Sequence, residues 1–325
     1  MTFLTRRHAL ALGGSTLLLP SFARAQAAWP AGPVTFVVGY AAGGSTDINA
    51  RELAQVMTPV IGQSIIIDNK GGAAGSIGLR AAAAAKPDGQ TLFVAVGTNV
   101  IINPHVQKGM IDTIASLAPV CQITDYQYVL VVGNSVPAKN AAELVAMAKK
   151  DPEKLTYSSS GVGGNNHLAG ALFADAAGIK MTHVPYKGTG QAVADVISGV
   201  ITANFSSLPP AVSQIKGGNL KALAVTGNKR VASLPDVPTL REQGIDVVVT
   251  SWQGLFAPAK TPDAVLDRIE AATKKAMTDP KWEAALTRDG LELAPNRTRA
   301  DFARFVASEH NFWGKKLKEL KIEME

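Results

Sequence analysis

The sequence predicts an α/β protein built from two lobes with largely parallel sheets. Short β-branched runs alternate with stretches of helical periodicity, which is typical of α/β units. The chain has 325 residues and one cysteine, so no intramolecular disulfide can substitute for a hydrophobic core. This length is sufficient for two domains. No internal repeat or low-complexity linker is present, which favours a discontinuous lobe and a chain that crosses between the lobes twice.

Nine short runs are the expected strands, and most contain four to six residues bounded by Gly, Pro, Asn or Asp. The runs are Val34–Val38, Ser64–Asp68, Thr91–Val96, Tyr128–Val132, Leu155–Ser158, Met181–Val184, Ala203–Ser206, Ala222–Val225 and Val247–Ser251. We expect the two crossings near Tyr126–Val132 and Val247–Trp252. They divide the chain into a first lobe, residues 26–127 and 253–325, and a second lobe, residues 128–252.

Helix boundaries are marked by capping chemistry. Asn140 and Thr239 each precede a Glu by three residues, which is the spacing of a capping box. Thr261 precedes a proline suited to the first position of a helix. Gly178 and Gly199 are placed to end two helices in a left-handed conformation. The segments between the expected strands are therefore predicted to be helical.

The first 25 residues have the pattern of an export signal. Arg6 and Arg7 precede an apolar stretch of about 11 residues, short of the ~18 that a membrane-spanning helix needs. A membrane anchor is thus the less favoured interpretation. Residues 23–25, Ala-Arg-Ala, form a signal peptidase pattern. The arginine pair resembles a twin-arginine signal but lacks the usual Phe two residues later, so the export route stays open. We expect cleavage near Ala25 and a periplasmic location.

The charge balance argues against a nucleic-acid partner. The chain has 32 basic and 26 acidic residues, and the expected signal peptide removes three arginines and no acid. The mature chain then has 29 basic and 26 acidic residues, a formal charge of +3. No dense Lys/Arg block is interleaved with aromatic residues. The remaining positive charge is a mild field that would steer anionic ligands.

Three glycine-rich stretches stand where an expected strand gives way to a helix. They are residues 39–47, 69–76 and 158–167. Glycine lets the backbone approach a ligand closely, and the following helix offers unpaired N–H groups and a partial positive charge. In open α/β sheets ligands gather at the carboxyl ends of strands, where these stretches lie. An anion site is predicted there, although tight turns alone also require glycine.

Motifs of catalysis, metal binding and cofactor binding are missing. The sequence has no HExxH, no Gly-x-Ser-x-Gly, no metal-spaced Cys/His cluster and no dinucleotide fingerprint or P-loop. We therefore expect no catalytic residues, no metal and no cofactor. His167, in the first turn of an expected helix, contacts either an anion or its own helix terminus. Cys121 lies in an apolar run and is expected to be a buried small side chain.

Several segments together resemble the Bug family, the extracytoplasmic receptors of tripartite tricarboxylate transporters. The resemblance follows the chain in order from about residue 29 to the C-terminus. The most specific matches are HVPYKGTG and LPDVPTLREQG. The matching segments are 41–51 (AAGGSTDINAR), 68–78 (DNKGGAAGSIG), 86–92 (KPDGQTL), 183–190 (HVPYKGTG), 220–230 (LKALAVTGNKR) and 234–244 (LPDVPTLREQG).

The resemblance implies a class II periplasmic-binding-protein fold, in which two α/β lobes joined by two crossover strands close over a ligand. It implies a small organic anion, a mono- or dicarboxylate, held by backbone amides, hydroxyls and waters. It further implies a monomer that hands this ligand to the membrane subunits of the transporter. The ligand-binding positions that it assigns are Ala42, Gly44, Ser45, Thr46, Asp47, Gly75, Ser76, Thr98, Asn99, Ser159, Gly163, Asn165, His167, Tyr186, Lys187, Gly188, Thr189, Asn204 and Ser206.

Alternatives stay open at this point. Asp47 either touches ligand or caps its helix, and Tyr186 and Lys187 either bind ligand or brace the surface between the lobes. Family members often carry Gly at the position of Ala74, which makes ligand transfer from relatives unsafe. Two rival functions are a receptor for a membrane sensor kinase and, less favoured, a secreted hydrolase, which would use Ser45 or His167.

Overall fold

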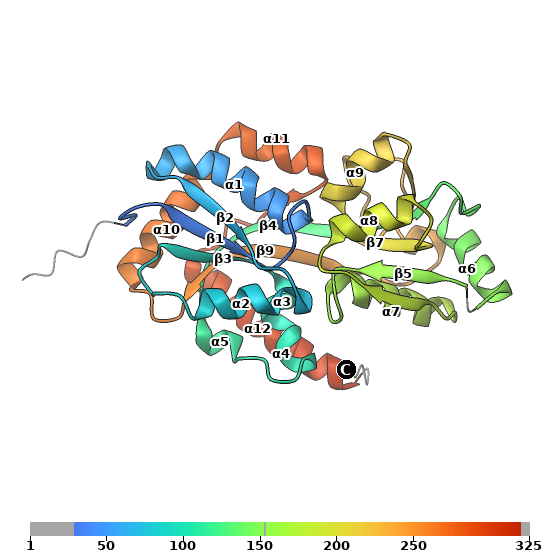
Figure 1. Ribbon diagram of the computed structural model, residues 1–325, viewed down its shortest axis with the longest axis horizontal. Coiled ribbons are helices and arrows are strands. Elements are labelled where there is room, and N and C mark those ends of the chain that lie inside the picture. Colours follow the sequence, from blue (N-terminus) through green and yellow to red (C-terminus); the bar gives the residue numbers. More distant parts are fainter. Residues whose placement is uncertain (1–28, 153, 320–325) are drawn as a thin grey trace, which may run out of the picture.

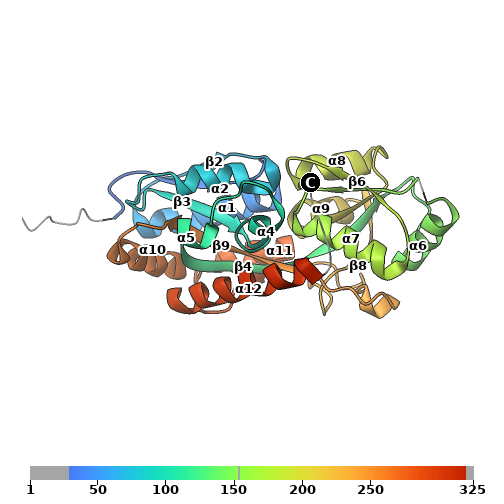
Figure 2. The same ribbon diagram turned by 90° about the horizontal axis from the view of Figure 1, so that it is seen from below.

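Ten strands run through both halves of the computed structural model, which describes residues 29–152 and 154–319. The main strand order is β2-β1-β3-β9-β4-β7-β5-β6, and β8 and β10 also pair with β4. Figures 1 and 2 show two lobes side by side, each with helices packed on its strands. The expected signal peptide, residues 1–25, lies outside the described residues. The predicted two-lobed α/β fold is confirmed, but the prediction of largely parallel sheets was wrong, because five of the nine strand pairings in the described residues are antiparallel.

The first lobe combines a parallel trio of strands with antiparallel partners. Its central strand β1 pairs in parallel with β2 and β3, and β3 pairs antiparallel with β9. The strands are β1 (Val34–Val38), β2 (Ile65–Asn69), β3 (Thr91–Val96), β9 (Thr250–Pro258) and β10 (Glu292–Leu293). The helices are α1 (Ser45–Ile61), α2 (Ser76–Ala83), α3 (Gly97–Ile101), α4 (Asn103–Val106), α5 (Thr113–Ser116), α10 (Asp263–Ala276), α11 (Pro280–Asp289) and α12 (Arg299–Glu319), with a 3-10 turn η1 (Ala73–Gly75).

The second lobe repeats this layered plan on a smaller scale. Its strand β5 pairs in parallel with β6 and β7, and β4 pairs antiparallel with β7 and β8. The strands are β5 (Thr156–Ser159), β6 (Thr182–Pro185), β7 (Ala203–Ser207) and β8 (Leu220–Val225). The helices are α6 (Ala141–Lys150), α7 (Asn165–Ala177), α8 (Thr189–Ile197) and α9 (Leu208–Lys216), with a 3-10 turn η2 (Arg241–Gln243).

Two segments carry the chain between the lobes. Strand β4 (Leu117–Gly133) is continuous through both, pairing with β9 in its first half and with β7 and β8 in its second. The return passes from Thr226, whose carbonyl accepts a hydrogen bond from Val249, into β9. The predicted strand Tyr128–Val132 is thus only the second half of a longer strand. The apolar run around Cys121, which is 3% exposed, forms the first half.

One predicted strand was displaced. We expected a strand over Val247–Ser251, but β9 begins at Thr250 and continues to Pro258. Gly254 lies within β9, where the ring of Phe302 packs in the place that a Cβ would take. A strand glycine here marks close packing and not a turn.

The capping predictions hold with two exceptions. Asn140 accepts a hydrogen bond from the Glu143 amide and caps α6. Thr239 and Glu242 form both capping-box bonds, but the helix that follows is a single 3-10 turn, η2. Thr261 does not cap α10, because its hydroxyl donates to a carbonyl behind it. Gly178 and Gly199 are both left-handed, as predicted.

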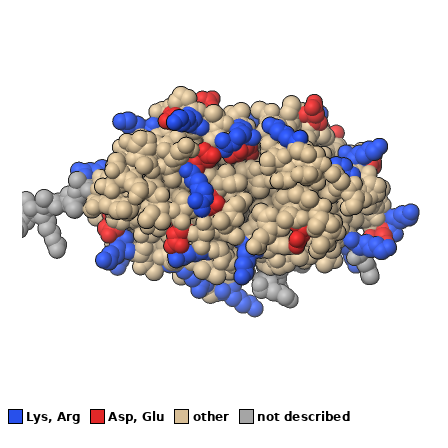
Figure 3. Space-filling view, turned by 45° about the horizontal axis from the view of Figure 1, so that its top comes forward, with Lys and Arg blue, Asp and Glu red and all other residues tan. Residues whose placement is uncertain are grey.

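Two surface properties bear on function. No helix within residues 29–152 and 154–319 has the length and hydropathy that a bilayer crossing requires. On the face in Figure 3, Lys and Arg side chains are interspersed with acids and do not gather into one block. This face offers no continuous basic stripe of the kind that binds nucleic acid.

Candidate ligand-binding site

A small cavity lies between the lobes, and we call it the interlobe cavity. Its volume is about 20 Å³, enough for roughly one water molecule. Both lobes and the crossing strand β4 contribute to its wall. The lining residues are Tyr40, Gly44, Ser45, Thr46, Val96, Thr98, Tyr126, Tyr128, Ser160, Asn165, Asn166, Thr189 and Ser207.

Four helices begin at this cavity. Helix α1 starts there with Ser45, α7 with Asn165, α8 with Thr189, and α9 directly after Ser207. The first turn of a helix has free N–H groups and a partial positive charge. The lining includes no Lys or Arg. The cavity therefore attracts negative charge through backbone dipoles and neutral donors.

Three buried side chains in the lining have polar atoms without a hydrogen-bond partner. They are the hydroxyls of Thr98 and Ser207 and the amide nitrogen of Asn166. All three residues are at most 3% exposed. An unpaired buried polar group costs about 1–3 kcal/mol, so such groups are rare unless a bound molecule satisfies them. The three atoms indicate where a ligand would accept hydrogen bonds.

Tyrosines from the crossing strand close the cavity on one side, and sequence reasoning missed them. Tyr126 and Tyr128 lie two residues apart on β4, so both side chains point to the same face. Burial raises the pKa of Tyr126, Tyr128 and also Tyr40, which keeps all three hydroxyls protonated. Asn165 donates to the Ser251 hydroxyl at 2.7 Å and ties α7 to the second crossing segment.

The structure brings six of the predicted site residues to the interlobe cavity. These six are Gly44, Ser45, Thr46, Thr98, Asn165 and Thr189. Two others, Tyr186 and Lys187, line a separate open groove. The remaining eleven lie behind the lining or beside it: Ala42, Asp47, Gly75, Ser76, Asn99, Ser159, Gly163, His167, Gly188, Asn204 and Ser206.

Several of these eleven residues hold the loops in place. The Asp47 carboxylate accepts from the Gly43 amide at 2.9 Å and pairs with Arg51 at 2.9 Å, so it braces the start of α1. The Asn204 amide donates to Ser158 at 2.8 Å. The Ser206 hydroxyl donates to the carbonyl of its neighbour. These contacts position the cavity wall and do not form it.

The carbonyl of Ala74 organises the loop that follows β2. It accepts hydrogen bonds from Asn99 at 2.7 Å, Asn103 at 3.0 Å and the Tyr40 hydroxyl at 3.1 Å. Ala73 and Ala74 have φ values of 47° and 49°, a left-handed conformation that alanine rarely adopts. The three hydrogen bonds hold the loop in this strained form, against Gly161 of the other lobe.

Two stacked histidines lie behind the third glycine-rich loop. The rings of His167 and His183 are 3.9 Å apart, and the Ser159 hydroxyl lies 2.6 Å from Nε2 of His183. Burial, reinforced by the neighbouring His167, lowers the pKa of His183 to about 4. Ser159 is fully buried and bonded to Gly161, so substrate cannot reach its hydroxyl. The pair therefore stabilises the loop.

Comparisons with known proteins agree with this geometry. Residues 49–322 match the family model described as the tripartite tricarboxylate transporter family receptor. A protein of Agrobacterium vitis, described as a UPF0065 protein in the TAR-I ttuE-ttuC' intergenic region, is 38% identical over 267 residues. That alignment covers 81% of this chain and 76% of the relative.

Three solved structures share the whole fold. The periplasmic binding protein BugD is 31% identical with a TM-score of 0.87, covering 91% of this chain and 100% of BugD. Rpa4515 of R. palustris, solved with adipate, is 30% identical with a TM-score of 0.85 (89% and 97% covered). MatC of Rhodopseudomonas palustris, solved with malate, is 28% identical with a TM-score of 0.83 (88% and 99% covered). This chain therefore belongs to the tripartite tricarboxylate transporter receptor family, which includes the Bug proteins, and is a solute-binding receptor of the periplasmic-binding-protein fold and not an enzyme.

Proposed function

We propose that this receptor works in the periplasm as a monomer, closes its lobes over a small organic anion with one or two carboxylates, and delivers it to the membrane subunits of a tripartite tricarboxylate-type transporter. The observation that carries the proposal is the set of unpartnered donors on Thr98, Asn166 and Ser207, in a cavity where four helices begin. Hydrogen bonds to a carboxylate are about twice as strong as neutral ones.

The chemistry of the lining supports an anion over a cation or an apolar ligand. No acidic side chain lines the interlobe cavity, so nothing there would neutralise a cation. Its hydroxyls and amides would remain unsatisfied around an apolar molecule. Related structures were solved with adipate and malate, both small carboxylates. These relatives support our assignment of the ligand of this receptor to the same chemical class.

The size of the cavity supports a cycle of opening and closing. About 20 Å³ is too little for a dicarboxylate, so we infer that the lobes move apart to admit the ligand and close around it with a larger cavity than in this structure. We place the hinge in the crossings near Tyr126–Val132 and Val247–Trp252. The moving bodies are then residues 26–127 with 253–325, and residues 128–252. Closure would present a shape that a membrane partner distinguishes from the open form.

Binding is tested by isothermal titration of the mature protein with malate, adipate, succinate and acetate. The diamide of succinate serves as a neutral control of equal size. Native mass spectrometry of freshly purified protein would identify any molecule that copurifies. We expect at least one carboxylate to bind and the diamide to fail. Binding of the diamide alone, or of cationic solutes alone, would overturn the assignment to anions.

Delivery and location need separate measurements. We expect the chain to appear in the periplasmic fraction with an N-terminus near Gln26. Ligand-loaded receptor with an affinity tag should retain transporter membrane subunits from solubilised membranes, and ligand-free receptor should retain fewer. Capture of a sensor kinase in their place would contradict the transport role and support the rival sensing role.

A further inference from the structure

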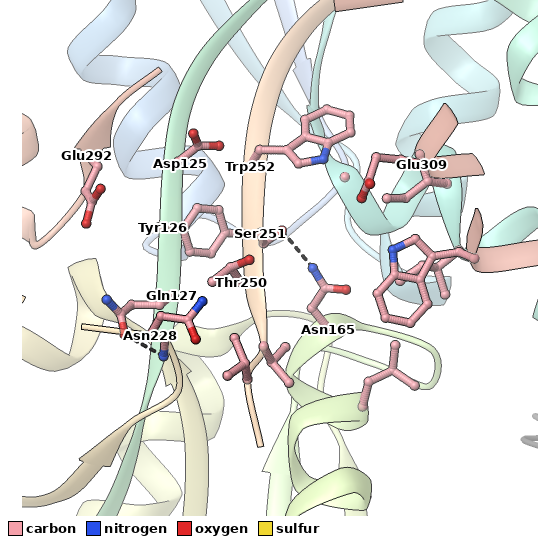
Figure 4. Close-up of a pocket in the computed structure, with 18 of the residues that line it drawn as sticks. Asp125, Tyr126, Gln127, Asn165, Asn228, Thr250, Ser251, Trp252, Glu292 and Glu309 are labelled. Carbon is pink, nitrogen blue, oxygen red and sulfur yellow. Dashed lines mark hydrogen bonds between the residues drawn. The ribbon is translucent and has the colours of Figure 1, made fainter. Parts of the chain in front are cut away.

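A second, larger cavity lies on the other side of the crossing segments, and we call it the hinge-side pocket (Figure 4). Its volume is about 590 Å³, within the range of small-molecule sites. Strand alternation places it opposite the interlobe cavity, because Asp125 and Gln127 of β4 point away from the face that carries Tyr128. Tyr126 and Asn165 line both cavities and form the wall between them.

Aromatic rings form one wall of this pocket. Trp252 and Phe305 lie 5.7 Å apart in an edge-to-face arrangement, and Trp313 of α12 also lines the pocket. The guanidinium carbon of Arg297 lies 4.1 Å from the centre of the Phe305 ring. A cation of the chain itself thus already rests on this wall, as expected for the negative face of an aromatic ring.

The pocket also has two carboxylates without a salt bridge to any described residue. Three acids line it, and Glu292 is paired with Lys229 at 3.1 Å. Asp125 and Glu309 form no ion pair with any described residue. Burial raises the pKa of Asp125 to about 6, with Glu292 adding to the rise and Arg297 opposing it, and burial also raises the pKa of Glu309. Arg297 lines the same pocket and lowers the pKa of both carboxyls, but burial outweighs it, so their partial burial is only partly compensated.

A fourth feature is the indole nitrogen of Trp252. It is buried, has no hydrogen-bond acceptor, and belongs to a residue that is 5% exposed. Figure 4 shows this nitrogen on the side of the ring that faces Glu309. A donor without an acceptor in a pocket wall is a position where a bound molecule gains a hydrogen bond.

We propose that the hinge-side pocket is a second small-molecule site, which takes an organic cation with an apolar or aromatic body and whose occupation favours the closed lobes. The cation would lie near Asp125 and Glu309, and the body against Trp252 and the apolar side chain of Leu172 on α7. Both lobes line this pocket and the interlobe cavity, on opposite faces of the crossing segments. A rotation that opens one cavity therefore narrows the other.

The binding part of this proposal is independent of the ligand in the interlobe cavity. Three probes share one aromatic body and differ in charge: phenethylamine, 2-phenylethanol and phenylacetate. Each is titrated into the mature protein and followed by calorimetry and by tryptophan fluorescence, since two of the four tryptophans line the pocket. We expect phenethylamine to bind at least tenfold more tightly than the neutral alcohol.

Variants locate the binding. Glu309→Gln removes a carboxylate, and Leu172→Trp fills the pocket from α7. Each should weaken phenethylamine binding at least tenfold, and thermal melts check that both remain folded. Asp175→Asn, on the exposed face of the same helix, is the matched control and should have no effect. Equal binding of the alcohol and the amine, or full affinity in both pocket variants, would overturn the site.

The coupling to closure rests on the proposed function and has its own readout. Saturating phenethylamine should reduce the radius of gyration measured by small-angle scattering without any carboxylate present. By reciprocity it should also tighten binding of whichever of malate and adipate binds, by about tenfold. An unchanged radius of gyration together with an unchanged affinity would overturn the coupling. Failure of all carboxylates to bind would count against the proposed function and leave the amine result standing.

Discussion

At the scale of single residues, hydrogen-bond accounting separates side chains that hold the fold from side chains that await a ligand. The Asn99 amide nitrogen donates to the Tyr40 hydroxyl and the Ala74 carbonyl, and its amide oxygen accepts from the Val96 backbone. Both polar atoms of this side chain are therefore occupied within the fold. Thr98, its neighbour, has a hydroxyl with no partner. Adjacent polar residues thus have different roles, which their order in the sequence does not reveal.

Replacing Thr98 should weaken binding without destabilising the fold. Thr98→Val removes the hydroxyl while preserving shape, and a hydrogen bond to a charged group contributes about 1.5–3 kcal/mol. We expect carboxylate affinity to fall by roughly 10- to 100-fold, while the free energy of unfolding without ligand rises by up to about 1–3 kcal/mol, because the unpaired buried hydroxyl is removed. Titration calorimetry and urea unfolding measure both. Thr98→Ser retains the hydroxyl and should bind normally, and equal weakening in the two variants would contradict this role.

Asn99→Ala is the converse case. It would leave the carbonyl of Ala74 and the hydroxyl of Tyr40 without the Asn99 donor in a buried site. We expect the free energy of unfolding to fall by on the order of 2 kcal/mol, because buried groups would lose their partners. Urea unfolding measures the change. If the variant is as stable as the wild type but defective in binding, Asn99 contacts the ligand and does not only support the loop.

The buried histidine pair predicts a pH dependence of stability. The pKa of His183 is about 4 in the fold and 6.5 ordinarily, so between these values the unfolded chain binds more protons. The free energy of unfolding should therefore fall as pH is lowered from 6.5 to 4. Asp125 acts oppositely, because its pKa is raised to about 6, and the fold gains relative stability as pH falls through 6.

Two variants separate these contributions. His183→Gln keeps a side chain able to bond Ser159 but cannot titrate, so its unfolding free energy should depend less on pH between 6.5 and 4. Asp125→Asn should steepen the same dependence by removing the opposing group. Urea unfolding at several pH values measures both slopes. Identical slopes in wild type and His183→Gln would show that the histidine is not the source.

At the scale of elements, the glycine-rich loops could be located from sequence, but their roles could not. The first, residues 39–47, and the third, residues 158–167, supply cavity residues such as Ser45 and Asn166. The second, residues 69–76, supplies none and instead forms the strained turn. The tyrosines of β4 escaped prediction because the strand was recognised only in part, and its face becomes cavity wall only when two lobes meet.

The strained turn predicts a stabilising substitution. Ala74 has a φ of 49°, where glycine has no steric penalty, and the hydrogen bonds to its carbonyl do not involve its side chain. Ala74→Gly should raise the free energy of unfolding by about 0.5–1 kcal/mol, after the entropy cost of glycine is subtracted. Thermal or urea unfolding measures it. A loss of stability would show that the Ala74 methyl, which packs near Gly161, contributes more than the strain costs.

Gly75 provides the matched contrast in the same turn. Its φ is 90°, and an added Cβ would lie 2.4 Å from the amide nitrogen of Asn99. Gly75→Ala should therefore destabilise the protein, by on the order of 1–3 kcal/mol. If Ala74→Gly raises the free energy of unfolding and Gly75→Ala lowers it, the result would confirm that backbone conformation governs this turn.

At the scale of the whole molecule, the glycine-rich loops of the two lobes touch one another through backbone and small side chains. The Ala41 amide donates to the Lys187 carbonyl at 3.4 Å, and Gly161 packs against Ala74. Few long side chains need to be ordered for such a contact, so closing the lobes costs little conformational entropy. The two-lobed plan can be predicted from the alternation of strands and helices in the sequence. The contact between the loops cannot, because its glycines touch residues that are remote from them in the sequence.

A disulfide across this contact tests whether closure traps the ligand. An ideal Cβ on Gly188 would lie 3.4 Å from that of Ala41, near the lower end of the 3.5–4.5 Å usual in disulfides. The backbone of Gly188 is extended, so cysteine fits there without strain. Cys121 is buried and its pKa is raised to about 12, so it would not compete for oxidation. Ala41→Cys with Gly188→Cys should therefore cross-link the closed form.

The cross-linked receptor should exchange ligand slowly. We expect carboxylate dissociation from oxidised, loaded protein to slow at least tenfold, and oxidised ligand-free protein to bind none, with both effects reversed by reductant. Stopped-flow displacement and calorimetry measure them, and Gly188→Cys alone is the control. Ligand exchange at the wild-type rate in fully oxidised protein would mean that ligand leaves without separation of the lobes. The interlobe cavity would then have an exit that does not involve the hinge, and the coupling between the two cavities would lose its basis.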